Sequence, residues 1–308
     1  MIEDINLLNG YMKRKYGRKL YKLALDGGMS CPNRDGTKGR GGCIFCSGGG
    51  SGEFAADRNI SVTEQISEAK KRIEGKLPKS EETGYIAYFQ AFTNTYGSVD
   101  YLERIFTEAI ENETIDVLSI ATRPDCLEDD KLELLGRLNR LKPVMIELGL
   151  QTADENTAVY INRGYENQVF EKAVKRLKEK NIEVVVHLII GLPGEDKAAF
   201  LKTIDYVNSL PVDGVKLQLL HILEGTVLAE YYKEGKADVL SMEEYTDILT
   251  SAIKRLRKDI VIHRMTGDGP KKILVAPEWS RDKKKVLNTI NKFIRDNNII
   301  QGDDYYGS

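Results

Sequence analysis

The chain has 308 residues, of which 41% are hydrophobic and 30% are charged, and its formal net charge is −2. These values are ordinary for a soluble protein with one large domain, and the near-neutral charge argues neither for nor against a nucleic-acid partner. Four cysteines are too few for a disulfide scaffold. Neither a signal peptide nor a bilayer-length apolar run is visible, so the sequence predicts a cytoplasmic protein with no membrane contact.

Basic residues concentrate near the amino terminus, and we interpret residues 1–19 as a basic N-terminal arm. The cations of the run 13–22, which also contains Tyr16 and Tyr21, are Lys13, Arg14, Lys15, Arg18, Lys19 and Lys22. Further basic groups lie at 254–258, 263–264, 271–272 and 281–285. Such clusters suit contacts with phosphates. The plainer alternative is that they are solvated helix faces balanced by acids elsewhere.

Three cysteines follow a predicted strand at Leu20–Leu25. Cys31, Cys43 and Cys46 lie in CPNRDGTKGRGGCIFC, and a glycine-rich stretch follows. Thiolates are soft ligands, and three of them would leave one iron of a four-iron cluster open. Phe45 would shield one face of that cluster from water. Structural zinc usually takes four ligands and a disulfide would leave one thiol over, so zinc and unliganded thiols are the weaker alternatives.

The rest of the chain alternates short apolar runs with longer amphipathic ones. The apolar runs, rich in β-branched residues, predict buried parallel strands at Tyr85–Gln90, Ile115–Ala121, Val144–Leu150, Ile182–Ile190, Gly214–Leu220 and Ile260–Met265. The amphipathic segments predict helices at Val62–Glu74, Val99–Asn112, Glu128–Leu141, Asn167–Lys180, Asp196–Ser209 and Met242–Lys258. Ser61, Ser98 and Ser241 stand where helix N-caps are favoured.

Repeated strand–helix units predict an α/β fold, a full or partial (β/α) barrel over residues 20–268. Polar or glycine-rich turns follow the strands at the end where such barrels bind ligands, for example TRPD at 122–125 and GLPGE at 191–195. No G-x-G-x-x-G follows the first strand, which removes the usual dinucleotide interpretation. Residues 269–308 are expected to form a short C-terminal extension with a basic helix at about 281–297.

The cysteine loop and the strand-end motifs together resemble the radical S-adenosylmethionine (SAM) superfamily. TRPD, ELGLQT (147–152), NRGY (162–165) and HLIIGLPGE (187–195) occur in the order seen in the branch related to the catalytic subunit of elongator. The cysteine loop with HRMTGDGP (263–270) is similar to the bacterial YtqA/YhcC-type group. The resemblance covers about residues 15–285. Most of the superfamily spaces its cysteines C-x3-C-x2-C, whereas the first gap here is eleven residues, a trait shared with the elongator-like branch.

The resemblance implies that Cys31, Cys43 and Cys46 ligate a [4Fe–4S] cluster whose fourth iron takes the amino and carboxylate groups of SAM. One electron, from a reducing partner such as flavodoxin or ferredoxin, would cleave SAM to methionine and a 5′-deoxyadenosyl radical. That radical abstracts a hydrogen atom from substrate, with the cofactor supplying the chemistry and the protein positioning it.

The resemblance also implies residues that hold the cofactor. Gln151 and Arg163 are candidates for its polar groups, His187 for its ribose and Gln90 for its methionine amine, with Phe45 beside the cluster. Arg163 could instead pair with a surface acid. His187 could instead be a core histidine whose hydrogen bonds are satisfied within the protein. Gln151 ends an apolar strand, so its amide needs a partner. Cys126 is best treated as a small apolar filler with no assigned role.

For the YtqA/YhcC-type group the implied substrate is the wobble uridine of tRNA. The implied reaction modifies its C5 side chain, taking carboxymethylaminomethyl-uridine toward aminomethyl-uridine. The anticodon loop would be the partner, since single-stranded bases can be splayed out into a pocket. Two alternatives stay open: a radical enzyme acting on a small metabolite or a protein, and a zinc-stabilised RNA-binding module without catalysis.

Overall fold

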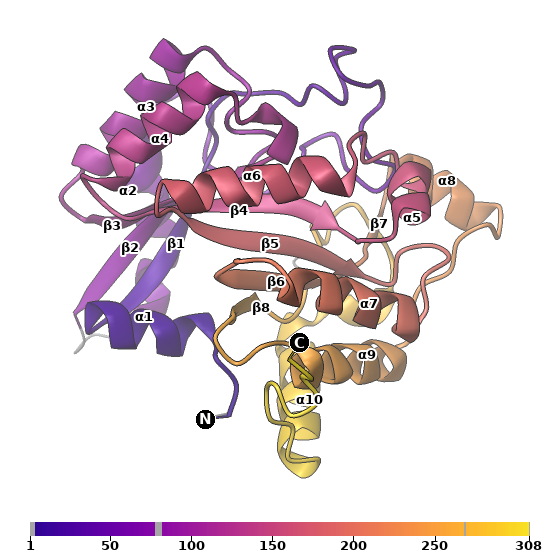
Figure 1. The fold of residues 1–308 in the computed structure, drawn as a ribbon. Coiled ribbons are helices and arrows are strands. Elements are labelled where there is room, and N and C mark those ends of the chain that lie inside the picture. Colours follow the sequence, from indigo (N-terminus) through magenta and orange to yellow (C-terminus); the bar gives the residue numbers. More distant parts are fainter. Residues whose placement is uncertain (1–3, 78–81, 268, 308) are drawn as a thin grey trace.

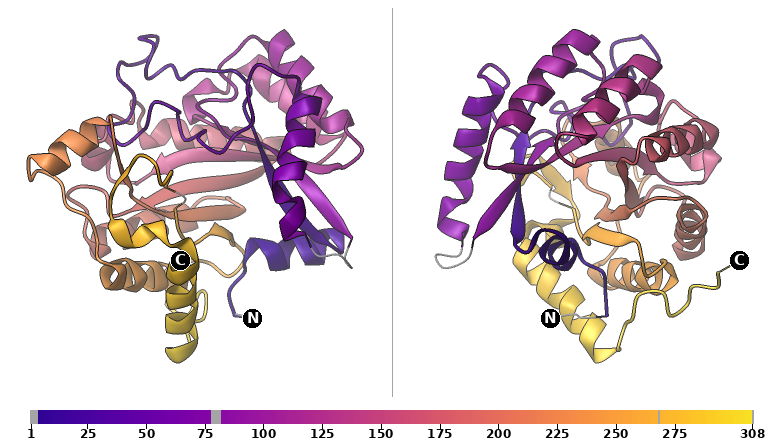
Figure 2. Two further views of the ribbon diagram at one scale, coloured as in Figure 1. Left: turned by 180° about the vertical axis from the view of Figure 1, so that it is seen from behind. Right: turned by 60° about the vertical axis from the view of Figure 1, so that its left-hand side comes forward.

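The computed structural model describes residues 4–77, 82–267 and 269–307. Its centre is a parallel sheet of seven strands in the order β1-β2-β3-β4-β5-β6-β8, curled into a half-barrel with helices on its outer face (Figures 1 and 2). The strands are β1 Lys19–Leu25, β2 Thr83–Phe89, β3 Ile115–Thr122, β4 Val144–Gln151, β5 Glu183–Ile190, β6 Gly214–Leu219 and β8 Val261–Arg264. The predicted α/β fold is confirmed, the full or partial barrel is a half-barrel, and each predicted strand is present.

The helices between the strands pack on the outer face through their apolar stripes, as amphipathic segments should. They are α2 Val62–Ile73, α3 Val99–Glu111, α4 Asp129–Asn139, α6 Asn167–Glu179, α7 Lys197–Asn208 and α9 Met242–Arg255. Ser61 and Ser241 are N-caps, as predicted, and each also forms a capping box with the glutamate three residues on. Ser98 occupies its N-cap position but makes no capping bond with its side chain.

Several short elements were not predicted because they are too brief to show a period. They are α1 Leu8–Tyr16, α5 Glu155–Tyr160, β7 Ile222–Leu223, α8 Val227–Lys233 and β9 Leu274–Ala276, with 3-10 turns η1 Glu74–Lys76, η2 Pro124–Cys126 and η3 Glu278–Arg281. The strands β7 and β9 pair antiparallel as a separate two-stranded sheet. The predicted C-terminal helix is α10 Lys283–Asp296. No helix of the described residues is long and apolar enough to cross a bilayer.

Helix α1 closes the end of the half-barrel where the strands begin (Figure 1). Its Met12 is buried in a cluster with residues near the starts of four strands, which are Leu20, Ile86, Val117 and Met145. Tyr11 on the same helix donates a hydrogen bond to the Glu183 carboxylate at the start of β5, with 2.9 Å between the oxygens. The basic N-terminal segment therefore packs under the concave interior of the sheet, which we call the lumen.

The two ends of the chain share the main core with the sheet. Ile5 near the amino terminus and Ile290 of α10 both belong to the large hydrophobic cluster that packs against the strands. Residue 268, the predicted end of the barrel, lies outside the described residues. The division into arm, barrel and extension stays a prediction.

Candidate functional site

Two adjoining cavities occupy the lumen toward the carboxyl ends of the strands. Their volumes are about 350 Å³ for the larger and about 180 Å³ for the smaller. The residues that line both are Phe45, Ser51, Tyr88, Gln90, Gln151, His187, Gln218 and Arg264. Four of these residues were predicted to hold a cofactor, and the structure brings them together around one space.

The three predicted cluster ligands, Cys31, Cys43 and Cys46, all line the smaller cavity. Burial raises the pKa of Cys43 to about 12 and also raises that of Cys46. The guanidinium groups of Arg123 and Arg34 act in the opposite direction, on Cys43 and Cys46 respectively. Thiolates at this position therefore need a bound cationic group, while the two arginines already favour negative charge.

The eleven-residue gap between Cys31 and Cys43 forms a compact turn that returns the chain to its starting point. Asp35 and Arg40 form an antiparallel bridge, and the Gly42 N–H donates to the Asn33 carbonyl at 2.9 Å. The Cys46 N–H then donates to the Cys43 carbonyl at 3.0 Å, closing the last turn. The unusual spacing thus still delivers all three thiols to one cavity.

The NRGY segment at 162–165 clamps this loop to the sheet. Asn33 Nδ2 donates to the Asn162 carbonyl and Asn162 Nδ2 donates to the Gly42 carbonyl, each at 2.7 Å. Gly164 has a φ of +79°, and a Cβ atom there would lie 2.8 Å from Asn33 Oδ1. The Tyr165 hydroxyl donates to the Gly149 carbonyl in β4. The motif therefore fixes the position of the cysteines relative to the end of β4.

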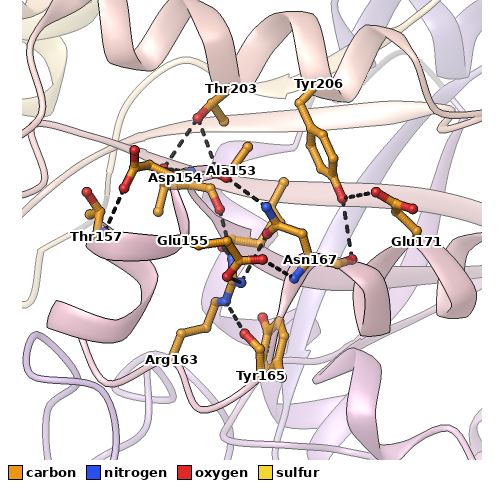
Figure 3. A network of polar contacts seen from close by, with 12 residues as sticks. Ala153, Asp154, Glu155, Thr157, Arg163, Tyr165, Asn167, Glu171, Thr203 and Tyr206 are labelled. Atoms are coloured by element: carbon orange, nitrogen blue, oxygen red, sulfur yellow. Dashed lines mark hydrogen bonds and ion pairs between the residues drawn. The ribbon is translucent and has the colours of Figure 1, made fainter.

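Arg163 is the centre of a buried polar network and is 1% exposed (Figure 3). Its guanidinium group donates to the carbonyls of residues 150, 152 and 165, to the Glu155 carboxylate and to Asn167 Oδ1, at distances from 2.8 to 3.2 Å. Since arginine has five N–H groups, all of its donors are committed to protein acceptors. Arg163 therefore supports the loop behind the site. It also lines the smaller cavity, and its predicted contact with the cofactor stays a prediction.

Gln151 has the features expected of a ligand-binding residue. It ends β4 at an irregularity in the β4–β5 register and has a φ of +65°, a strained conformation for a residue other than glycine. Its side-chain Oε1 is buried without a hydrogen-bond partner among the described residues. A buried amide oxygen without a donor is costly, so a ligand that donates to it would relieve this cost.

The other predicted cofactor residues also line the cavities, each with a protein partner. Gln90 Nε2 donates to the Ser51 carbonyl at 2.7 Å, which ties the end of β2 to the loop after the cysteines. Phe45 packs against the small hydrophobic cluster beside the cysteine loop. His187 Nε2 lies 2.7 Å from Glu147 Oε2. Their predicted contacts with a cofactor stay predictions.

Glu147 forms a charged cluster at mid-height in the lumen, which the sequence analysis did not assign. Its side chain is 0% exposed. Its Oε1 accepts from Lys22 Nζ at 2.6 Å and from Ser119 Oγ at 2.8 Å. Its Oε2 accepts from Lys216 Nζ and His187 Nε2. One carboxylate on β4 therefore gathers donors from β1, β3, β5 and β6.

The charges of this cluster follow from its surroundings. Burial opposes ionisation of Glu147, but the ammonium groups of Lys216 and Lys22 outweigh it and hold its pKa well below the usual range. Burial and the nearby Lys216 lower the pKa of His187 to about 4, against the attraction of Glu147. His187 is therefore a neutral hydrogen-bond donor to an ionised carboxylate at neutral pH.

A signal for this cluster is present in the sequence. Glu147 and Lys216 interrupt otherwise apolar strands, and Lys22 is two residues from the apolar Leu20 on the inward face of β1. Residues that alternate along a strand share one face. Counting Lys22 with the basic run 13–22 concealed its inward position.

The residues around the smaller cavity fit the cluster and SAM that the sequence analysis expected. Three soft ligands face one space, Gln151 offers an unpartnered acceptor, and Phe45 covers one side. Among the described residues no group of three histidine, cysteine or acidic side chains is placed to hold a single metal ion.

Comparison with known proteins identifies the family. Residues 35–207 match the model of the Radical SAM superfamily, and residues 212–296 match that of the Radical_SAM C-terminal domain. The chain is 41% identical to the uncharacterized protein YtqA of Bacillus subtilis over 295 residues, which cover 96% of this chain and 91% of that protein.

More distant similarities extend to a tRNA enzyme and a solved structure. The chain is 30% identical over 173 residues to the tRNA uridine(34) acetyltransferase of Methanocaldococcus jannaschii, covering 53% of this chain and 31% of that protein. The structure of the archaeal Methanocaldococcus infernus Elp3 with an N-terminal deletion matches with a TM-score of 0.68 and 17% identity, over 92% of this chain and 64% of that one. The likeness to this solved structure shows a shared fold only.

The position of Arg163 leads to a stability prediction. Arg163→Lys removes donors to buried carbonyls, so we expect it to lower the free energy of unfolding of the metal-free protein by about 2–4 kcal/mol. Arg137→Lys, at an exposed ion pair, is the matched control and should change it by less than about 0.5 kcal/mol. Urea unfolding measures both. Equal stability of the two variants would contradict the supporting role.

Proposed function

The chain belongs to the radical SAM superfamily, and from this premise we propose that it modifies the C5 side chain of the wobble uridine in tRNA. Cys31, Cys43 and Cys46 would hold a [4Fe–4S] cluster, and SAM would occupy the adjoining part of the lumen. The bound cofactors supply the reductive cleavage of SAM to a 5′-deoxyadenosyl radical. The proposed conversion takes carboxymethylaminomethyl-uridine toward aminomethyl-uridine.

The observation that carries the cofactor assignment is the shared cavity of the three thiols and the unpartnered Gln151 amide oxygen. Gln151 would accept a hydrogen bond from SAM. His187 would present a neutral imidazole whose orientation is fixed by Glu147. Phe45 would exclude water from the cluster, and Gln90 would hold the loop after the cysteines over the bound cofactor. Each of these residues would orient the cofactor or shield it from water, and none of them would need to transfer a proton.

The tRNA assignment is supported by the relative that acts on tRNA uridine(34) and by the shape of the site. The larger cavity lies beyond the cysteines, and a base must leave its stack to reach so deep a space. Its lining ends at Gly269 and Pro270, and the exposed Lys271 and Lys272 follow directly. Cations at that position can contact the phosphates on either side of an inserted base.

The N-terminal basic run has a different position from the one expected of an RNA-binding arm. It packs at the start of the strands, Lys15 pairs with Glu183, and Lys22 lies in the lumen. Contact between tRNA and the cavity mouth therefore depends on other cations. The family assignment leaves no basis for a zinc-stabilised binding module, whereas a metabolite or protein substrate remains the second candidate.

The function is tested by nucleoside analysis. Enzyme reconstituted anaerobically with iron, sulfide and SAM is incubated with tRNA that carries carboxymethylaminomethyl-uridine, and the digested nucleosides are analysed by mass spectrometry. We expect this nucleoside to be consumed and aminomethyl-uridine to appear in equal amount. Cleavage of SAM with an unchanged nucleoside profile would keep the family and refute the tRNA substrate.

Salt dependence tests the two lysines at the mouth. Replacing both Lys271 and Lys272 with alanine should weaken tRNA binding and reduce the slope of log K against log salt by about 1–2. The control replaces the exposed Lys172 and Lys175 of α6 with alanine, which should leave the slope unchanged. Filter binding between low and moderate salt gives both slopes. Equal slopes for the two double variants would show that Lys271 and Lys272 do not contact the RNA.

A further inference from the structure

Two lysines share one carboxylate in the lumen. Lys22 and Lys216 both bond to Glu147, and both lie beside the ring of Tyr88, with Nζ 4.7 Å and 4.5 Å from the ring centroid. Lys216 also donates to the Tyr88 hydroxyl at 3.0 Å. Their side chains are 20% and 3% exposed respectively, so bulk water screens these charges poorly.

The charges of this cluster do not cancel. Among the described residues that line the two cavities, the carboxylates are Glu147 and Glu53. Glu53 is exposed and accepts a hydrogen bond from Ser47, within the loop that follows the cysteines. If Lys22 and Lys216 are both protonated, two ammonium groups and one carboxylate leave one positive charge in excess at Glu147, and Arg264, which lines both cavities, adds a further cation. The other titratable groups that face the cluster are Tyr88, His187, His263 and Arg264, none of which is an anion at neutral pH.

A buried excess charge is unfavourable unless an opposite charge joins it. Lys216 responds in this way: burial and the neighbouring cations Lys22 and Arg264 lower its pKa well below the usual range, despite Glu147. A bound anion would restore the balance and favour the charged form of Lys216. The lumen therefore selects for a ligand with a negative group at this depth.

The position of Lys22 indicates which ligand carries that group. Lys22 lines the larger cavity, which none of the three cysteines lines, whereas Lys216 and Glu147 line the smaller cavity. In the proposed function the carboxylate of SAM is bound at the cluster, on the cysteine side. The larger cavity is left for the substrate, and Lys22 Nζ has two further N–H groups beyond the one directed at Glu147.

We propose that Lys22, linked to Lys216 through the Glu147 carboxylate that both bond, is a subsite for a carboxylate on the substrate. This inference rests on the proposed function and deepens it: the C5 side chain of carboxymethylaminomethyl-uridine ends in a carboxylate, and Lys22 would pair with it. The pair would place the side chain between the lysines and the cofactor. It would also discriminate against the aminomethyl product, which keeps the amine but lacks the carboxylate that pairs with Lys22.

The subsite is tested by equilibrium binding to anticodon stem-loops. Reconstituted enzyme with SAM is titrated with three stem-loops that differ only at the wobble base: carboxymethylaminomethyl-uridine, its neutral carboxamide counterpart, and aminomethyl-uridine. The wild-type protein should prefer the carboxylate over the carboxamide by about tenfold, the effect of one charged hydrogen bond. Lys22→Met should abolish the preference, and Lys22→Arg should retain most of it.

Controls separate the possible failures. Lys22→Met leaves Lys216 and Glu147 as a balanced pair, so we expect it to fold, and Lys175→Met on the outer surface should behave as wild type. SAM affinity should be unchanged in Lys22→Met. The subsite would be overturned if Lys22→Met kept the preference for the carboxylate, or if Lys22→Met lost affinity for SAM instead of that preference.

Equal binding of all three stem-loops to the wild-type protein would overturn the subsite and leave the tRNA function standing. If the wild-type protein bound none of the stem-loops, both proposals would be refuted.

Discussion

The structure depends on how one buried carboxylate is neutralised. Glu147 stands at mid-height in the lumen of a half-barrel and is bonded by side chains from four other strands. An isolated ionised carboxylate at that position would be strongly unfavourable, and so would the two lysines without it. The curl of the sheet brings these groups together. The same requirement sets the shape of the cavities, because Tyr88 and His187 belong both to the cluster and to the cavity walls.

The lumen is organised in layers along the strands. Apolar residues at the strand starts pack against Met12 of α1 and close one end. The Glu147 cluster forms the next layer, and above it polar side chains such as Gln90 and Gln151 line the cavities. The cysteine loop covers the other side, held by Asn33 and the NRGY segment. A site closed at its base and covered by a fixed loop suits chemistry that water and stray hydrogen donors must not reach.

The sequence predicted the elements whose signals are local. The parallel strands are continuous apolar runs, and the cysteine loop combines three soft ligands with glycines. The remaining features depend on long-range packing. Arg163 appears in a motif, but all of its N–H groups donate to carbonyls and side chains that the fold brings together. Lys22 lies in a basic run, yet strand alternation turns it inward. Glu147 and Lys216 could have been found, since charged residues inside buried strands require partners.

The most direct test of the account is the dependence of SAM cleavage on the three cysteines. Anaerobically reconstituted protein is reduced with dithionite, SAM is added, and 5′-deoxyadenosine is measured with and without bulk tRNA. The account predicts cleavage that rises with tRNA, is lost when Cys31, Cys43 or Cys46 is replaced by alanine, and persists in Cys126→Ala. Absence of cleavage from protein with a full complement of iron and sulfide would contradict it.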